Sequence, residues 1–186
     1  FVAGNSYSGA HKTAFSVVRY GNVMGSRGSV IPLFLSLKTS GILPITHDSM
    51  TRFMITLQEG VELVWHAFED MLGGEIYVKK IPSMKVVDIA RTVAPAARLD
   101  IVGIRPGEKL HEQMIGAEDS YYTYEYPDHY KILPAIDDYS HSEIRVKDGV
   151  KVPDRFIYSS DNNQQWMSSE ELTSWIETNQ IAVGTV

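Results

Sequence analysis

The chain has 186 residues, of which 44% are hydrophobic, with 17 basic and 23 acidic side chains and a formal net charge of -6. That length supports one sizeable domain, and the acidic balance argues against non-specific binding to nucleic acid or to a membrane surface, which needs a basic face. The mean hydropathy of -0.14 is that of an ordinary globular protein. The lack of cysteine excludes disulfides and agrees with a reducing cytoplasm, where we expect the protein to act.

The first elements predict a strand, a glycine-rich turn and a helix. Residues 13–19 alternate into a β-branched run, which predicts a buried strand. Residues 20–30 (YGNVMGSRGSV) then contain three glycines, which indicate a tight turn or a close approach of the backbone to a ligand. Ser29 is suited to cap a helix over residues 30–37, and Pro32 falls in its tolerated first turn.

A short strand and the most regular helix of the chain come next. Gly41 is expected to end the preceding helix, and residues 42–47 predict the strand. Residues 57–72 have helical spacing of their apolar positions, and Gly73-Gly74 is expected to stop that helix. The apolar residues concerned are Val61, Leu63, Val64, Ala67, Phe68 and Leu72.

Strands and helices continue to alternate over the rest of the chain. Residues 75–78 and 99–104 predict strands, and residues 85–94 predict a helix between them. A Pro-Gly turn is expected to lead into a short helix within RPGEKLHEQMI, and the last helix spans residues 169–178. The apolar face predicted for the 85–94 helix consists of Val86, Ile89, Ala90 and Val93. This alternation predicts an α/β fold.

Polar residues follow two of the predicted strands. Asn22 and Arg27 place hydrogen-bond donors at the carboxyl end of a strand, where parallel sheets bind ligands. Arg105 directly follows the 99–104 strand, and Glu108 comes three residues later. An arginine fork suits a diphosphate, and a carboxylate can accept from a sugar diol. The alternatives are an ordinary strand-to-helix turn at Asn22 and a surface ion pair between Arg105 and Glu108.

Other catalytic and metal-binding patterns are incomplete. His111-Glu112 begins like a zinc-protease helix but lacks a second histidine four residues on, and the six histidines are scattered, so we expect no metal ion. The segment YYTYEYPDHY could offer stacking surfaces, but acidic residues interrupt it, which favours a partly buried strand over a nucleic-acid surface.

Five segments taken together resemble the UDP-N-acetylglucosamine 4,6-dehydratases of the C5-inverting type, which belong to the extended short-chain dehydrogenases/reductases. The segments are FSVVRYGNVMGSRGSVIPLF, PITHDSMTRFMITL, GGEIYVKKIPSMKVVDIA, GIRPGEKLHEQMI and YSSDNNQQWM. The resemblance implies the C-terminal part of a doubly wound Rossmann-like fold (residues 1–40) followed by a smaller nucleotide-sugar-binding α/β subdomain and tail (residues 41–186).

The resemblance also implies ligands and the residues that bind them. NADP would lie against Val23, Met24, Gly25, Ser26 and Arg27. UDP-N-acetylglucosamine would be bound by Asn22, Val30, Thr46, Arg105 and Glu108, with help from Arg52. The family acts in pseudaminic acid biosynthesis, as a homo-oligomer, with no nucleic acid or membrane partner.

One family feature is missing from the chain. No tyrosine is followed four residues later by lysine, and no Gly-x-Gly-x-x-Gly turn opens the sequence. Residues 1–12 resemble the end of the helix that follows the family's Tyr-x-x-x-Lys pair. We therefore expect the catalytic residues upstream of Phe1 and no activity from the 186 residues alone. A UDP-sugar epimerase of the same family and a non-catalytic nucleotide-sugar-binding module remain as alternatives.

Overall fold

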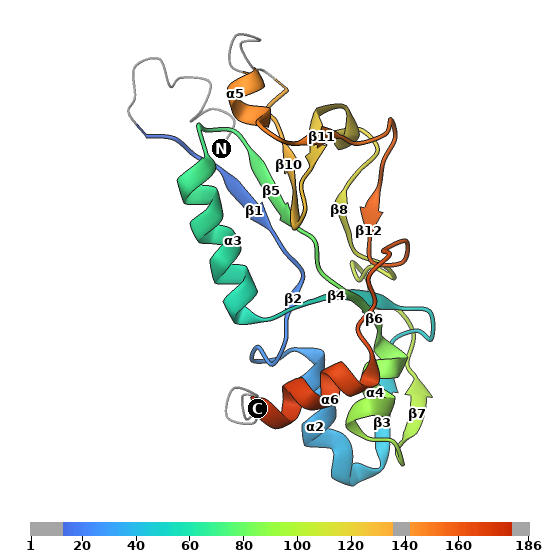
Figure 1. Ribbon diagram of the computed structural model, residues 1–186. Coiled ribbons are helices and arrows are strands. Elements are labelled where there is room, and N and C mark those ends of the chain that lie inside the picture. Colours follow the sequence, from blue (N-terminus) through green and yellow to red (C-terminus); the bar gives the residue numbers. More distant parts are fainter. Residues whose placement is uncertain (1–12, 136–141, 180–186) are drawn as a thin grey trace. The chain divides into compact units, whose positions relative to one another are not determined.

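Two compact units make up the chain, and each draws on three separate stretches of sequence. The computed structural model describes residues 13–135 and 142–179 (Figure 1). Unit 1 combines residues 1–20, 58–80 and 113–158, whereas unit 2 combines residues 21–57, 81–112 and 159–186. The family-based division of the chain at residue 40 stays a prediction, and the helix end expected in residues 1–12 lies outside the described residues.

Unit 1 is built on a five-stranded mixed sheet. β1 runs parallel to β5, with Val18 opposite Tyr77, and the other pairings are antiparallel. The order across the sheet is β1 (Val17–Arg19), β5 (Ile76–Lys79), β10 (His129–Ile132), β9 (Thr123–Glu125) and β11 (Val150–Lys151). The first strand is shorter than the predicted 13–19 and is only half-buried, and Phe15, which precedes it, is 46% exposed.

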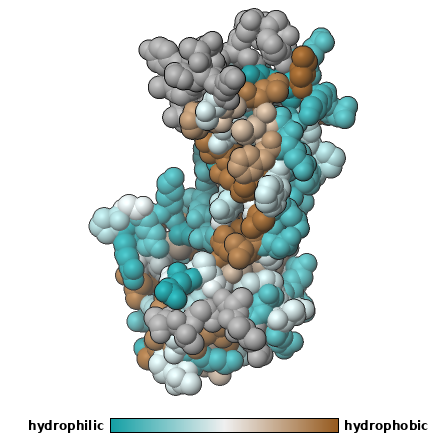
Figure 2. Space-filling model, turned by 90° about the vertical axis from the view of Figure 1, so that its left-hand side faces the viewer, coloured by the Kyte–Doolittle hydropathy of each residue, from teal (hydrophilic) through white to brown (hydrophobic). Residues whose placement is uncertain are grey.

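Helix α3 (Leu57–Asp70) packs along the sheet of unit 1 (Figure 1). Leu63 and Ala67 are buried against Tyr77, as expected for an amphipathic helix. The apolar residues predicted from its periodicity divide between two faces, however. Val61, Trp65 and Phe68 of α3 and Leu72 just after it stay exposed. Apolar residues colour part of this face brown in Figure 2.

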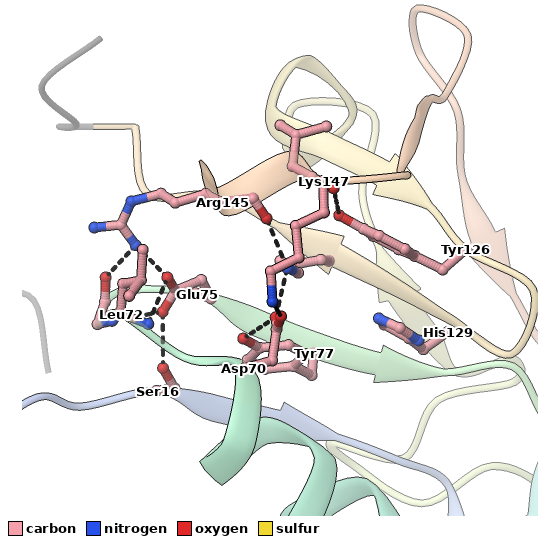
Figure 3. A network of polar contacts seen from close by, with 12 residues as sticks. Ser16, Asp70, Leu72, Glu75, Tyr77, Tyr126, His129, Arg145 and Lys147 are labelled. Carbon is pink, nitrogen blue, oxygen red and sulfur yellow. Dashed lines mark hydrogen bonds and ion pairs between the residues drawn. The ribbon is translucent and has the colours of Figure 1, made fainter. Parts of the chain in front are cut away.

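A buried ion pair joins α3 to strand β10 in unit 1 (Figure 3). The Lys131 ammonium lies 2.5 Å from an Asp70 oxygen, and the Lys131 side chain is 2% exposed. Asp70 also accepts hydrogen bonds from Tyr77 at 2.7 Å and from Lys147 at 2.5 Å. Burial alone raises the pKa of Asp70, but these hydrogen bonds outweigh it and hold the pKa well below its usual range.

Glu75, which precedes β5, is the second buried carboxylate of unit 1 (Figure 3). It accepts hydrogen bonds from the backbone of Leu72 and Gly73, at 3.0 and 2.7 Å, and pairs with Arg145. Glu75 therefore satisfies two backbone N–H groups of the segment that follows α3, and the helix ends before Gly73-Gly74, where the φ angles of 117° and 91° are not helical.

Unit 2 combines two small sheets with three helices. In one sheet β4 (Thr51–Ile55) lies between β2 (Asn22–Val23), which is parallel to it, and β6 (Ser83–Lys85), which is antiparallel. In the other, β3 (Ile42–Ile45) pairs in parallel with β7 (Arg98–Ile101). The helices are α2 (Val30–Leu37), α4 (Val86–Val93) and α6 (Ser169–Thr178). The remaining short element within unit 2 is η1 (Lys38–Ser40), whereas β8 (Gln113–Ile115), η2 (Asp119–Tyr122) and α5 (Ser142–Val146) belong to unit 1. β12 (Tyr158–Ser159) pairs with β8.

The core of unit 2 confirms the apolar face predicted for residues 85–94. The four apolar residues predicted for the 85–94 helix are all buried in α4. They pack with Phe34 of α2, Leu43 of β3 and Leu172 of α6 in one cluster. None of the described helices combines the length and the apolar composition that crossing a membrane requires.

Two sequence expectations are wrong, and one strand was missed. No helix follows Pro106-Gly107, because Gly107 has a φ of 82° and the Leu110 carbonyl accepts from Thr51 of β4 instead of closing a helical turn. The tyrosine-rich segment forms two strands, β9 and β10, and not one. Strand β4 was not predicted, because its residues are buried on both faces except for Arg52 and so do not alternate.

Candidate functional site

Strand β2 places Asn22 beside β4 through an unusually close backbone approach at Gly21. A Cβ atom on Gly21 would lie 2.4 Å from Phe53 Cβ and 2.7 Å from the Phe53 carbonyl oxygen. Glycine is therefore required by the chain's own packing at this position. Asn22 then stands opposite Met54 with its side chain exposed.

The side chain of Asn22 faces the carboxylate of Glu112. In the amide orientation that gives both groups a hydrogen bond, the Asn22 nitrogen donates to the two Glu112 oxygens at 3.0 and 3.2 Å. Burial raises the pKa of the Glu112 carboxyl, although the Arg52 charge opposes the rise. Glu112 was noted in the sequence only as part of an incomplete zinc motif.

Arg52 of β4 occupies the centre of this group. Its Nη1 donates to the carbonyl oxygens of Thr51 and Leu110, at 2.7 and 3.2 Å. Its other nitrogens lie 3.7 Å from Glu112 and 3.9 Å from Glu108. Because its side chain is 14% exposed and already lies between two carboxylates, Arg52 is suited to hold the loop from Glu108 to Glu112 in place.

Glu108 accepts hydrogen bonds from two of the other predicted residues. The Thr46 hydroxyl donates to one of its oxygens at 3.4 Å, and the backbone N–H of Arg105 approaches the other at 3.3 Å. The Arg105 guanidinium is exposed and forms no ion pair within the described part of the chain. The alternative of an Arg105–Glu108 surface ion pair is therefore not what the structure contains.

The segment predicted to lie against a cofactor forms the turn between β2 and α2. The side chain of Met24 is buried in the core of unit 2, and Gly25 has a φ of 72°. Ser26 donates from its backbone N–H to Val23, which closes the turn, and Arg27 is exposed. Contacts from Met24 to a ligand would have to come from its main chain.

Ser29 and Val30 begin helix α2. Ser29 occupies the predicted N-cap position, but its hydroxyl makes no capping hydrogen bond. Val30 is partly buried against the core of unit 2. No hydrogen bond or ion pair between described residues connects Val30 or residues 23–27 with Glu108 or Glu112.

A buried polar cluster beneath the site supports Glu112. The Ser160 hydroxyl accepts from the backbone N–H of Glu112 at 2.9 Å and lies 2.6 Å from the Thr51 hydroxyl. The Thr51 hydroxyl in turn lies 2.8 Å from His111 Nδ1. His111 thus takes part in a structural hydrogen-bond network, and within residues 13–135 and 142–179 no three acidic or histidine side chains form a metal-binding group.

The structure therefore brings four of the predicted residues into one network: Asn22, Thr46, Arg105 and Glu108. Arg52 and Glu112 connect them. The exposed Arg105 guanidinium offers a charged two-pronged donor, and the carboxylates and the Asn22 amide offer groups that sugar hydroxyls can bond. Chemically, these groups are suited to binding an anionic ligand that carries hydroxyl groups.

Known proteins resemble the chain along most of its length. Residues 1–134 match the family model described as "Polysaccharide biosynthesis protein". A "UDP-N-acetylglucosamine 4,6-dehydratase (inverting)" from Campylobacter jejuni is 52% identical over 180 residues, which cover 92% of this chain and 54% of the relative. A "UDP-glucose 4-epimerase" from Rickettsia canadensis is 35% identical over 173 residues, covering 90% of this chain and 50% of the relative.

A solved structure has the same fold. The X-ray structure of Pen from Bacillus thuringiensis superposes with a TM-score of 0.82 at 30% identity, covering 96% of this chain and 54% of that one. The predicted α/β, Rossmann-like class is confirmed by this likeness and by the parallel strand pairs. The chain spans about half the length of the curated relatives it matches.

Proposed function

We propose that the chain, which belongs to the polysaccharide biosynthesis protein family, is the nucleotide-sugar-binding part of a C5-inverting UDP-N-acetylglucosamine 4,6-dehydratase. The 52% identity to the Campylobacter jejuni relative supports this reaction over others in the family. The product would be a UDP-4-keto-6-deoxy-hexose, made in the cytoplasm for pseudaminic acid biosynthesis and for glycosylation such as that of flagellin.

One observation gives the main support for a role in ligand binding. Glu108 satisfies its carboxylate with Thr46, Arg52 and the Arg105 backbone, so the Arg105 guanidinium keeps its donors for a ligand. We assign Arg105 to the diphosphate of UDP, because guanidinium donates two parallel hydrogen bonds with a permanent charge. Glu108 and Thr46 would bind the uridine end, and Asn22 and Val30 would line the sugar pocket.

The turn from Val23 to Arg27 fits NADP in two respects. Gly25 has no side chain, so a flat nicotinamide ring could approach the main chain there. The exposed Arg27 guanidinium is suited to bind a phosphate. When bound, NADP supplies the hydride acceptor and donor that the dehydration needs. In this reaction the residues of this chain would orient the sugar and balance the charge of its diphosphate.

Two measurements test the proposal. Titration calorimetry with UDP should give binding to the 186-residue chain, or to the protein at its full natural length if the shorter chain proves insoluble. The full-length protein, incubated with UDP-N-acetylglucosamine and NADP, should yield a product lighter by one water in mass spectrometry. The 186-residue chain alone should yield none, because the Tyr-x-x-x-Lys pair is absent from it.

A UDP-sugar 4-epimerase is the second candidate, because a relative of that description is 35% identical over 173 residues. An epimer has the same mass as its substrate, so a new product of unchanged mass would favour the epimerase. Failure of the full-length protein to bind UDP at millimolar concentration would contradict both candidates.

A further inference from the structure

The hydrogen bond between Asn22 and Glu112 determines which group Asn22 can offer to a ligand. A primary amide has its nitrogen and oxygen on opposite sides of a planar group. With the nitrogen directed at the Glu112 carboxylate, the carbonyl oxygen is directed away from it, on a side chain that is exposed. The sequence suggested Asn22 as a hydrogen-bond donor, whereas this geometry makes it an acceptor.

Glu112 is itself held firmly in place. Its backbone N–H donates to the Ser160 hydroxyl at 2.9 Å, and its carbonyl accepts from the Ser160 backbone at 2.8 Å. Arg52 Nε lies 3.7 Å from the carboxylate on the side of β4. The side chain is 31% exposed, and burial favours keeping it bonded to a donor. A carboxylate fixed in this way can fix the amide that it contacts.

We propose that Glu112 is a positioning residue that holds the Asn22 amide so that its carbonyl oxygen accepts a hydrogen bond from a hydroxyl or amide N–H group of the bound sugar. This inference rests on the proposed function, because it assumes a nucleotide-sugar at Asn22. It also assigns a specificity: the ligand must present a donor at this point. Glu112 acts through Asn22 and does not touch the sugar.

The test compares two probes, UDP and UDP-N-acetylglucosamine, by calorimetry on the full-length protein. Glu112→Ala frees the amide to rotate, so binding of UDP-N-acetylglucosamine should weaken roughly three- to tenfold while binding of UDP stays unchanged. Glu112→Gln retains one acceptor oxygen and should recover most of the loss. Glu125→Ala, which removes a carboxylate from strand β9 of unit 1, is the matched control and should affect neither probe.

A double-mutant cycle separates positioning from direct contact. If Glu112 acts only through Asn22, the Asn22→Ala/Glu112→Ala variant should bind UDP-N-acetylglucosamine no more weakly than Asn22→Ala alone. If the losses in affinity of the two single variants multiply in the double variant, the inference is overturned. Equal weakening of UDP binding and UDP-N-acetylglucosamine binding in Glu112→Ala would also overturn it. An unchanged affinity of Glu112→Ala for UDP-N-acetylglucosamine would overturn it as well. A wild-type protein that binds neither probe contradicts the proposed function instead.

A measurement on the wild type covers the case in which Glu112→Ala fails to fold. In NMR spectra, the Asn22 side-chain amide protons should exchange slowly with water, since the nitrogen is bonded to Glu112. The same protons should exchange faster in Glu112→Gln, where one charged acceptor is lost. Equal, fast exchange in both proteins would show that the amide is not held.

Discussion

Arg105 and Glu108 are joined by hydrogen bonds from their backbone N–H groups, and the Arg105 guanidinium takes no part in the link. The Arg105 N–H lies 3.3 Å from a Glu108 oxygen, and the Glu108 N–H donates to the Arg105 carbonyl at 3.0 Å. These two hydrogen bonds close a tight turn that contains Gly107, which has a φ of 82°. The turn leaves the guanidinium outside the pair, so the two residues are free to have separate roles toward a ligand.

Replacing Arg105 by lysine should weaken UDP binding although the charge is kept. One ammonium cannot reproduce two parallel hydrogen bonds, and a charge-assisted hydrogen bond contributes about 1.5–3 kcal/mol, which corresponds to roughly ten- to a hundredfold in affinity. Calorimetry with UDP on the full-length protein measures this. Arg98→Lys on exposed strand β7 is the control. Equal affinities of wild type and Arg105→Lys would remove Arg105 from the diphosphate site.

Gly21→Ala should destabilise the protein, because the new methyl group would overlap Phe53 of β4. Overpacking of this kind costs about 1–3 kcal/mol, since β2 must move away from β4. Gly60→Ala is the contrasting variant: a Cβ there meets nothing within 4 Å, so near the start of α3 it should stabilise by up to about 1 kcal/mol. Urea unfolding of both variants gives the comparison. A neutral Gly21→Ala would mean that β2 and β4 lie further apart.

Asp70→Asn should lower stability by about 3–5 kcal/mol, because it removes the charge partner of the fully buried Lys131. Asp128→Asn is the matched control. Asp128 pairs with Lys79 and with His129, but its side chain is 65% exposed, so solvent screening should keep the loss smaller than that of Asp70→Asn. Urea unfolding at neutral pH measures both. Equal losses in the two variants would show that burial does not strengthen the Asp70 pair.

The Asp70 pair also gives a pH dependence. The pKa of the Asp70 carboxyl is lower in the folded protein than in the unfolded chain, where it is about 3.9. The pair therefore stabilises the fold above about pH 4. As the pH falls from there through the folded pKa, the carboxylate takes up a proton and this stabilisation is lost. The difference in unfolding free energy between wild type and Asp70→Asn should therefore shrink on acidification. A difference that is constant between about pH 7 and pH 2.5 would contradict the assignment.

Two serine N-caps offer a direct comparison of capping. Ser168 accepts from the Glu171 backbone at 3.2 Å and completes a capping box at α6, whereas Ser29 makes no such bond at α2. Ser168→Ala should cost about 0.5–2 kcal/mol in thermal or urea unfolding, and Ser29→Ala should cost less. A larger loss at Ser29 would mean that its hydroxyl has a role other than capping.

Local periodicity was enough to predict the helices of unit 2. The residues predicted for α2 and α6 are the residues found, and α4 is one residue shorter at each end than predicted. These helices repeat their apolar positions within the segment, so the sequence records which face is buried. Strand β4 gave no such signal, because it is buried on both faces and its pattern is set by strands distant in sequence.

The residues proposed for the site could be chosen from the sequence, because its resemblance to a family pointed to Asn22, Thr46, Arg105 and Glu108. Their hydrogen-bond partners could not, because these depend on how the elements pack. Glu112 became a partner of Asn22 because β2 and the loop before β8 meet at Arg52, and a contact between residues 90 positions apart leaves no local pattern. Spacing along a chain records which face of an element is apolar, whereas hydrogen-bond partners across elements are set by packing.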